Sequence, residues 1–277
     1  MIGVFDSGYG GLTILKEFVK KLPEYDYSYF GDNARTPYGT RSFETVYRYT
    51  LECVKYLFDE GCQLVILACN TASAKALRTI QQRDLPNLYP ERRVLGVIRP
   101  IAEVVGRYTL TGHIGILGTV GTVRSFSYPI EIEKFDNDEV SKDHSNIKVF
   151  QEACPMWVPL VESNEHQNAG SDYFVKQHID NLLRQSHDID VIVLACTHYP
   201  LLLSKIKKYV PAAVRILSQG KIVAESLANY LYRHPEMDNR LGKNGVRIFK
   251  TTDSPELFDQ NASIFFGREV KSEKVNL

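Results

Sequence analysis

Two cysteines occupy matching places in the chain and are the first candidates for chemistry. Cys69 follows an apolar run at residues 64–68, and Cys196 follows a second run at residues 191–195. A thiol at the carboxyl end of a buried strand lies where open α/β sheets build their sites. Both runs finish in Leu-Ala-Cys, and small polar or ionisable residues come next: Asn70 and Thr71 in one copy, Thr197 and His198 in the other. The repeat therefore predicts one site that takes a thiol from each half of the chain.

Three interpretations of this cysteine pair remain open on the residues alone. A disulfide would need the two Cα atoms within about 7 Å, and such bridges are rare in a reducing compartment. Inert core thiols are the second interpretation, because cysteine is among the most buried residue types. In the third, a thiolate removes a proton from one face of a carbon while a thiol on the other face returns one.

The neighbours of the cysteines favour the acid–base interpretation. His198 can hold a thiolate at Cys196, because a nearby cation stabilises the charged sulfur. Removing a proton beside a carboxylate builds negative charge there, so the site also needs hydrogen-bond donors. Asn70, Thr71 and Thr197 are residues of that type.

Two further segments carry candidate groups. Asp6 follows the apolar run at residues 2–5, so it lies at a strand end like the cysteines, with a helix N-cap as the alternative interpretation. The Gly-, Asn- and Pro-containing segment at residues 31–39 is typical of a loop. Pro37 would fix a turn there with free N–H groups, although an ordinary connecting loop has the same composition. Cys53 and Cys62 are predicted to be core thiols.

Composition narrows the class of protein. With 33 basic and 33 acidic residues the formal net charge is zero, and no basic block is present, so nucleic acid is not expected as the main partner. No apolar run reaches the length of a membrane span, and the N-terminal residues do not form a signal peptide. The five cysteines are therefore expected to be reduced and cytosolic. The absence of Cys-x-x-Cys and His-x-x-x-His pairs gives no support to a metal site, and residues 8–11 lack the Lys-Ser/Thr of a phosphate loop.

Strand and helix patterns alternate along the chain, which predicts α/β architecture with parallel sheets covered by helices. Strands are expected at residues 2–5, 27–30, 64–68, 94–98, 113–119, 147–150, 191–195, 213–217 and 246–250. Helices are expected at residues 12–22, 43–60, 72–82, 101–108, 120–132, 172–185, 201–209 and 222–232. Residues 136–146 are predicted to be a surface loop, 154–162 an irregular apolar segment and 255–266 a mixed segment.

The pattern restarts near residue 113 with what resembles a fresh first strand, which predicts two doubly wound, pseudo-symmetric domains. We expect the first domain to comprise residues 1–97 together with a return of the chain at about 207–277. The second domain is expected to comprise residues 98–206.

Six segments, taken in order and spacing, resemble bacterial glutamate racemases. They are residues 3–11 (GVFDSGYGG), 29–39 (YFGDNARTPYG), 68–73 (ACNTAS), 114–122 (IGILGTVGT), 158–162 (VPLVE) and 196–202 (CTHYPLL). No single motif is specific, but the combination covers the chain from residue 2 to about residue 205.

The resemblance implies a cofactor-independent interconversion of L- and D-glutamate, which supplies D-glutamate for peptidoglycan, in a cleft between two α/β domains. It assigns the catalytic thiols to Cys69 on the D-glutamate side and Cys196 on the L-glutamate side. Asp6 would support Cys69, whereas Glu162 and His198 would support Cys196. Substrate contacts would fall on Asp6, Ser7, Tyr38, Gly39, Asn70, Thr71, Thr119, Thr122, Thr197 and His198. We also expect a cytoplasmic homodimer that uses no metal.

The chain departs from the family pattern at two places. Ala195 stands where the family usually has glycine, and Ser218-Gln219-Gly220 stands where Asp-Ser-Gly is frequent, so residues 206–277 are the least defined. Aspartate racemase, or another amino-acid racemase of the same superfamily, is the alternative enzyme, although the loop at Pro37–Gly39 favours glutamate. A non-catalytic amino-acid-binding protein is the alternative of another class. Inversion needs both thiols and binding needs neither, so the second cysteine separates these alternatives.

Overall fold

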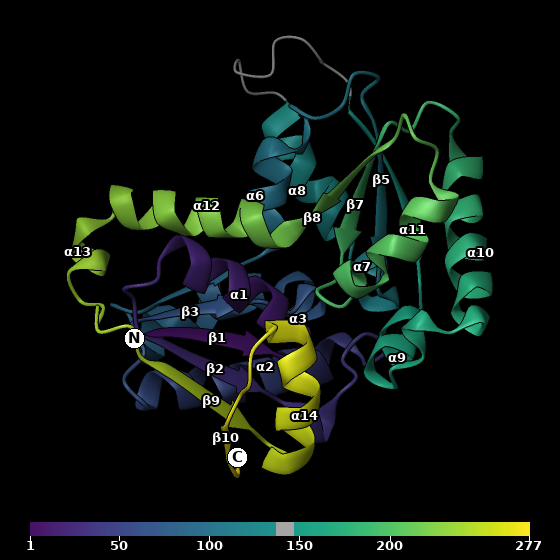
Figure 1. The fold of residues 1–277 in the computed structure, drawn as a ribbon. Helices are drawn as coiled ribbons and strands as arrows, with labels where there is room; N and C mark the ends of the chain where they lie inside the picture. The colour runs from purple at the N-terminus through teal and green to yellow at the C-terminus, as the bar shows by residue number, and fades with distance from the viewer. Residues whose placement is uncertain (137–146) are drawn as a thin grey trace. The chain divides into compact units, whose positions relative to one another are not determined.

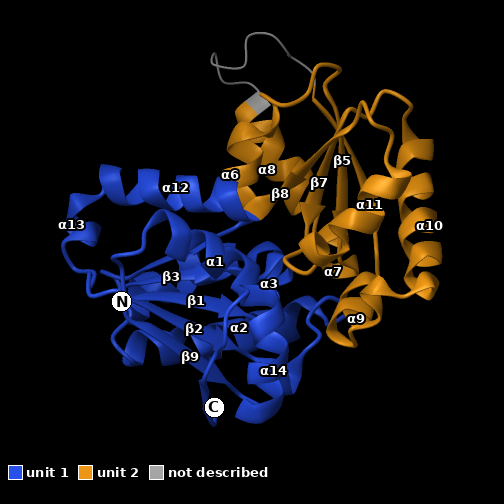
Figure 2. Cartoon of the chain, in the orientation of Figure 1, with its two compact units in different colours: residues 1–97, 220–277 blue, residues 98–219 orange. Residues whose placement is uncertain are grey.

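The computed structural model describes residues 1–136 and 147–277, and it divides the chain into two compact units. Unit 1 comprises residues 1–97 and 220–277, and unit 2 comprises residues 98–219 (Figure 2). Unit 1 resumes at Gly220 rather than near residue 207, because the strand at Arg215–Ser218 pairs within the sheet of unit 2. The surface loop expected at residues 136–146 lies, from residue 137 on, outside the described residues.

Unit 1 is built on a six-stranded sheet in which every pairing is parallel. The strand order is β10-β9-β2-β1-β3-β4, which places the first strand of the chain in the interior of the sheet. The strands are β1 (Ile2–Asp6), β2 (Tyr27–Gly31), β3 (Leu64–Leu67), β4 (Arg93–Gly96), β9 (Arg247–Thr251) and β10 (Ser272–Lys274). The helices are α1 (Leu12–Lys21), α2 (Phe43–Asp59), α3 (Asn70–Lys75), α4 (Leu77–Thr79), α5 (Leu85–Leu88), α12 (Gln219–Arg233), α13 (Pro235–Asp238) and α14 (Pro255–Phe266).

Both faces of this sheet are covered, so its strands are apolar on both sides. Along β2 the side chains alternate: Tyr27 and Tyr29 contact Phe18 of α1 and Phe258 of α14, whereas Phe30 contacts Tyr56 of α2. The α1–α14 layer therefore lies on one face and α2 on the other, as can be followed in Figure 1. Continuous apolar runs are what a doubly covered parallel sheet requires.

Unit 2 is built on a four-stranded parallel sheet with the order β6-β5-β7-β8. Its strands are β5 (His113–Gly118), β6 (Lys148–Ala153), β7 (Val191–Ala195) and β8 (Arg215–Ser218). Its helices are α6 (Ile98–Val105), α7 (Val120–Arg124), α8 (Ser127–Asp136), α9 (Trp157–Glu162), α10 (Ala169–Gln185) and α11 (Leu203–Tyr209). Figure 1 shows α10 on one side of this sheet and α6 with α8 on the other.

The two sheets share a strand order. Four strands of unit 1 run β2-β1-β3-β4, and the whole sheet of unit 2 runs β6-β5-β7-β8. In each unit the strand that precedes a cysteine, β3 or β7, therefore pairs with the first strand of that unit, β1 or β5. The predicted α/β class with two parallel sheets is confirmed.

Several predicted elements need correction. The segment at residues 154–162, expected to be irregular, ends in helix α9. The segment at residues 255–266, expected to be mixed, is the continuous helix α14. Ser254 is the N-cap residue of α14, and its side chain accepts a hydrogen bond from the Leu257 N–H. The helix expected at residues 72–82 is split into α3, α4 and a π-helical turn at Ile80–Asp84. The helix expected at 101–108 is α6, which begins and ends three residues earlier. The short edge strand β10 was not predicted.

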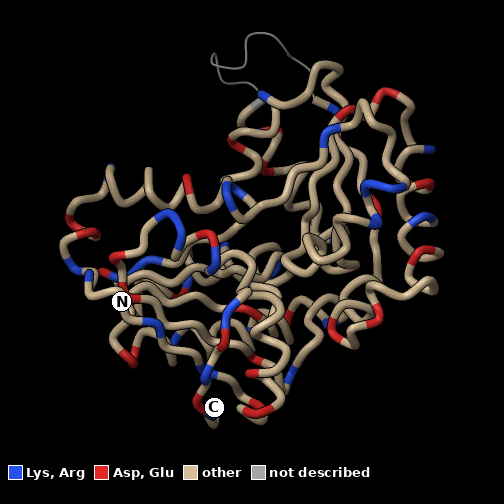
Figure 3. The backbone as a smooth tube through the Cα atoms, in the orientation of Figure 1, with Lys and Arg blue, Asp and Glu red and all other residues tan. Residues whose placement is uncertain are grey.

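Residues of both charge signs are spread along the backbone of each unit, in keeping with a net charge of zero (Figure 3). Within residues 1–136 and 147–277, no helix has the length and apolarity that crossing a membrane requires. Cys53, which is part of α2, and Cys62, which follows that helix, are fully buried in the core of unit 1, as predicted.

Candidate active site

Cys69 and Asp6 lie at the carboxyl-terminal ends of two neighbouring strands in the sheet of unit 1. β1 and β3 are parallel neighbours, with Phe5 opposite Leu67, so both strands end at the same level. Asp6 is the last residue of β1, and Cys69 is the N-cap residue of α3. Both are almost wholly buried, at 1% and 6% exposure, so the thiol and the carboxyl group are held in a largely water-excluded place.

The turn after β1 connects these two groups. The Ser7 hydroxyl lies 3.5 Å from the Cys69 sulfur, and the Gly8 N–H donates to Asp6 Oδ2 at 2.9 Å. The buried Tyr29 phenol donates to the Gly8 carbonyl at 2.8 Å, which fixes the turn from the neighbouring strand β2. The structure thus places Asp6 at the strand end, as expected, and places the Ser7 hydroxyl beside the Cys69 thiol.

Four more candidate residues lie in unit 1. Asn70 and Thr71 form the first turn of α3 directly after Cys69 and are 2% exposed. Tyr38 and Gly39 belong to the loop after β2, and the Tyr38 side chain is buried at 1% exposure. Its phenol donates to Asp32, so the ring anchors the loop and only the backbone of this residue is left for a ligand.

Unit 2 repeats the arrangement at the ends of β5 and β7, where Gly118 is opposite Ala195. Thr119 follows β5 and caps α7: its hydroxyl accepts from the Thr122 N–H at 3.2 Å and lies 3.0 Å from the Thr122 hydroxyl. Cys196, Thr197 and His198 follow β7 and are all buried. The five candidate residues of unit 2 therefore lie just beyond the ends of two adjacent parallel strands.

His198 joins Cys196 to Glu162 in a line of three groups. Its Nδ1 lies 3.9 Å from the Cys196 sulfur, and its Nε2 lies 3.0 Å from Oε1 of Glu162, the last residue of α9. Burial alone lowers the pKa of His198, but its hydrogen bonds to Cys196 and Glu162 and their charges raise that pKa to about 10. His198 is therefore a cation at neutral pH, and a cation beside a sulfur stabilises a thiolate.

The groups beside the cysteine sulfur differ between the strand ends of unit 1 and those of unit 2. In unit 2 the thiol has a charged imidazole and a carboxylate in line with it, whereas in unit 1 it has a hydroxyl and the nearby strand-end carboxyl group of Asp6. Each arrangement can give or accept a proton at sulfur, with the partner groups compensating the change of charge.

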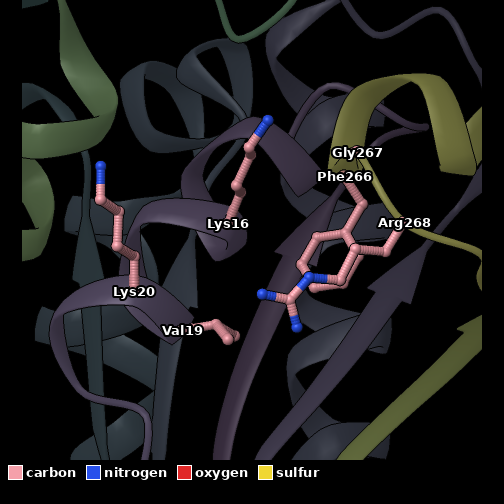
Figure 4. Close-up of a pocket in the computed structure, with 6 residues that line it drawn as sticks. All are labelled: Lys16, Val19, Lys20, Phe266, Gly267 and Arg268. Atoms are coloured by element: carbon pink, nitrogen blue, oxygen red, sulfur yellow. The ribbon is translucent and has the colours of Figure 1, made fainter.

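Among the described residues, no group of three or more His, Cys, Asp or Glu is placed to hold a metal ion. A surface pocket of unit 1 lies between α1 and the end of α14 (Figure 4). Its lining contains no candidate site residue and consists of Lys16, Val19, Lys20, Phe266, Gly267 and Arg268.

Sequence reasoning did not assign a role to Asp32, Arg35 or Tyr29. Tyr29 fixes the turn beside Cys69, and Asp32 with Arg35 fixes the loop that carries Tyr38. A signal for Asp32 was present, because it directly follows strand β2 just as Asp6 and the cysteines end or follow theirs.

Comparisons with known proteins point in one direction. The model of the Asp/Glu/Hydantoin racemase family matches residues 3–227. A glutamate racemase of Persephonella marina is 38% identical over 277 residues, which cover 100% of this chain and 97% of that protein. The crystal structure of a glutamate racemase isoform from Bacillus anthracis has a TM-score of 0.87 at 35% identity and covers 100% of this chain and 97% of its own. That of Francisella tularensis glutamate racemase in complex with D-glutamate has a TM-score of 0.84 at 29% identity, with 99% and 97% covered.

Proposed function

The chain belongs to the Asp/Glu/Hydantoin racemase family, and from that premise we propose that it interconverts L- and D-glutamate. The observation that carries the proposal is the pair of cysteines at the ends of β3 and β7, each buried beside its own polar partners. Full-length identity of 38% to a glutamate racemase favours glutamate over aspartate as the substrate.

The reaction needs one thiolate and one thiol. With D-glutamate, the Cys69 thiolate removes the α-proton, and the Cys196 thiol gives a proton to the opposite face of the same carbon. The product is L-glutamate, and the protonation states of the two sulfurs have been exchanged. With L-glutamate the roles reverse, so the same pair serves both directions without an added acid or base.

The remaining candidate residues support these two transfers. Asp6 and Ser7 act beside Cys69, and His198 with Glu162 acts on Cys196. The intermediate carries negative charge on the α-carboxylate, which hydrogen-bond donors stabilise. Asn70, Thr71, Thr119, Thr122 and Thr197 supply side-chain donors, and the backbone at Tyr38 and Gly39 supplies N–H groups.

Proton exchange at the α-carbon tests this proposal directly. Purified protein is incubated in D₂O with each enantiomer of glutamate and with each enantiomer of aspartate, without added cofactor. We expect deuterium at the α-carbon of both glutamate enantiomers, together with the loss of optical rotation, and far slower exchange with aspartate. Equal or faster reaction of aspartate would contradict the glutamate assignment, and binding without exchange would indicate a non-catalytic protein.

The cellular setting follows from the same proposal. We infer a cytoplasmic enzyme that supplies D-glutamate for peptidoglycan and works as a homodimer. None of the five cysteines forms a disulfide in the structure, which fits a reducing compartment. Sedimentation analysis of the purified protein tests the dimer. We also propose that the two compact units are its two domains.

A further inference from the structure

Asp32 lies outside the catalytic groups but is fully buried at the edge where the strands of unit 1 end. It follows β2, and its backbone N–H donates to the carbonyl of Asp6, the last residue of β1. A buried carboxylate is costly unless it is paired and hydrogen-bonded. The contacts of Asp32 therefore show which groups stabilise its buried carboxylate and which of them it holds in place.

Both carboxylate oxygens of Asp32 are occupied. Oδ2 accepts from Arg35 Nε at 2.7 Å and from the Tyr38 hydroxyl, and Oδ1 accepts from the Thr252 hydroxyl at 2.9 Å. Burial raises the pKa of the Tyr38 phenol far above its ordinary value, so the phenol keeps its proton and donates it to Asp32. Asp32 thus ties Tyr38 to the strand end by a charge-assisted hydrogen bond.

Two other elements brace the same carboxylate. Arg35 also binds Glu52 of α2, and its guanidinium lies 4.2 Å from the ring centroid of Tyr49. On the other side Thr252 follows β9, and its hydroxyl accepts from the Ala34 N–H at 3.0 Å. The loop between Asp32 and Gly39 is consequently fixed by α2 and by the returning C-terminal segment at once.

This bracing leaves two donors of the loop unused. Within the described residues, the backbone N–H groups of Tyr38 and Gly39 donate to no protein atom. Tyr38 is buried and Gly39 is only partly exposed, so these donors lack full hydration and are suited to an anionic group. Their direction is set by the anchor of Tyr38.

We propose that Asp32 is a positioning residue of the glutamate site, which holds the loop donors of Tyr38 and Gly39 in place through the Tyr38 phenol. The proposal rests on the proposed function, since it takes glutamate as the anion. Asp32 itself touches neither the substrate nor a sulfur in this assignment. Its effect is on substrate binding and is equal for the two enantiomers, because the loop belongs to neither proton-transfer step.

Tyr38→Phe is the sharpest test, because it removes one hydroxyl and keeps the buried ring. Tyr47→Phe is the matched control: Tyr47 lies in the same unit, is buried, and donates to another aspartate, Asp84, at 2.8 Å. A lost charge-assisted hydrogen bond corresponds to about a tenfold change in an equilibrium constant. We expect Tyr38→Phe to raise KM about tenfold for both enantiomers with little change in kcat, and Tyr47→Phe to leave KM unchanged.

Two further variants examine the carboxylate. Asp32→Asn keeps an oxygen that can accept from Tyr38, so we expect a smaller rise in KM than for Tyr38→Phe. Thr252→Val removes the hydroxyl on the far side of Asp32 and should raise KM in the same direction. Melting temperatures of all variants show whether each protein is folded.

Three results would overturn the proposal. They are an unchanged KM in Tyr38→Phe, equal increases in Tyr38→Phe and Tyr47→Phe, or a fall in kcat at constant KM. The wild-type protein is assayed first, and if it does not racemise glutamate, the proposed function fails independently. Calorimetric titration with D-glutamate then compares the same variants by Kd, so a role of Asp32 in binding is still decided.

Discussion

The two sulfurs differ in the groups that surround them. Cys196 lies next to an imidazole whose pKa is raised to about 10, whereas the Cys69 sulfur lies 3.5 Å from the neutral Ser7 hydroxyl. The proposed mechanism needs one sulfur as a thiolate and the other as a thiol. Different surroundings favour different protonation states for two such groups. The roles of the two thiols can therefore be examined one at a time.

If the proposed mechanism holds, replacing either the Cys69 or the Cys196 sulfur should nearly stop racemisation. A proton-transfer group contributes on the order of 10² to 10⁴ in rate, so we expect losses of that size in Cys69→Ser and Cys196→Ser. Each variant should keep one half-reaction, and a β-substituted glutamate that eliminates its leaving group after proton removal reports it. Cys196→Ser should eliminate from the D-side substrate and Cys69→Ser from the L-side substrate.

The supporting groups should follow the same division. Asp6→Asn should slow the step on the D-glutamate side more, and His198→Asn the step on the L-glutamate side more, as measured by α-proton exchange of each enantiomer. A preference of both cysteine variants for the same enantiomer would refute the assignment of one sulfur to each face. A disulfide between Cys69 and Cys196 in fully active protein would do the same.

The raised pKa of His198 predicts how the stability of the folded protein depends on pH. A group whose pKa rises from 6.5 to about 10 on folding stabilises the folded state fully below pH 6.5 and loses that effect as the pH rises to 10. The difference in free energy of unfolding between the wild type and His198→Gln should therefore shrink between pH 6.5 and 10. Urea unfolding at several pH values measures it, and a constant difference would mean that His198 is neutral when folded.

How far the residues of the site were predictable depends on how local their signals are. Cys69, Cys196 and Asp6 each end or follow an apolar run, and that is visible in a few neighbouring residues. Tyr38 is expected to contact the substrate, and because its phenol donates to Asp32, the proposal assigns that contact to its backbone N–H. That pairing depends on Arg35, Glu52 and Thr252, which only the folded chain brings together.

At the scale of elements, the site depends on the close approach of α1 to the ends of β1 and β3. Gly11 is the N-cap residue of α1, and a Cβ atom there would lie 2.6 Å from Cβ of Asp6 and 3.0 Å from Cβ of Ala68. No side chain can be accommodated at such distances without moving its neighbours. The glycine thus allows the helix to begin directly behind the Asp6 carboxyl group.

Gly11→Ala should consequently impair both stability and activity. Overpacking of this kind costs about 1–3 kcal/mol, and we expect the displaced Asp6 to slow proton exchange with D-glutamate more than with L-glutamate. Gly170→Ala is the control, since a Cβ there meets nothing within 4 Å and the residue lies in the first turn of α10. Denaturation curves and α-proton exchange rates are compared between Gly11→Ala and Gly170→Ala. Equal stability and equal exchange rates in the two variants would show that the neighbours of Gly11 move aside at no cost.

Three of the mispredicted elements, α9, α14 and β10, each have their own physical cause. Pro159 interrupts the apolar segment in the sequence, yet it occupies the first turn of α9, where no intrahelical N–H bond is needed. α14 carries polar residues between its phenylalanines, but Phe258, Phe265 and Phe266 are buried and determine its position. β10 is polar and pairs only at the edge of the sheet, so it has no apolar run that could have revealed it.

At the scale of the whole chain, one organisation is used twice. In each unit the first strand and the cysteine strand are parallel neighbours, so the restart in the sequence at residue 113 reflects a repeated sheet order. The second crossing was harder to predict, because β8 completes the sheet of unit 2 immediately before α12 begins the return to unit 1. No glycine- or proline-rich linker marks that point in the sequence.

The discontinuous unit 1 leads to a prediction about which segments unfold together. Phe258 of α14 is 1% exposed and packs on the rings of Tyr9 and Tyr29, with centroid separations of 5.4 and 6.2 Å. Phe258→Ala leaves a cavity there and should cost about 3–5 kcal/mol. If the two units are domains, amide protection should fall in residues 1–97 and 220–277 together, although these segments are far apart in the sequence.

Leu182→Ala supplies the reciprocal variant in unit 2, where Leu182 is fully buried in α10 and packs close to Gly115 of β5. Protection should then fall across residues 98–136 and 147–219 and persist in unit 1. Hydrogen exchange with peptide-level mass spectrometry distinguishes the two patterns. Loss of protection over the entire chain in both variants would mean that the units unfold as one, because locally coupled amides report the size of the cooperative unit. Loss confined to residues 220–277 in Phe258→Ala would instead show that the returning segment is dispensable for the strands beside it, which the pairing of β9 with β2 argues against.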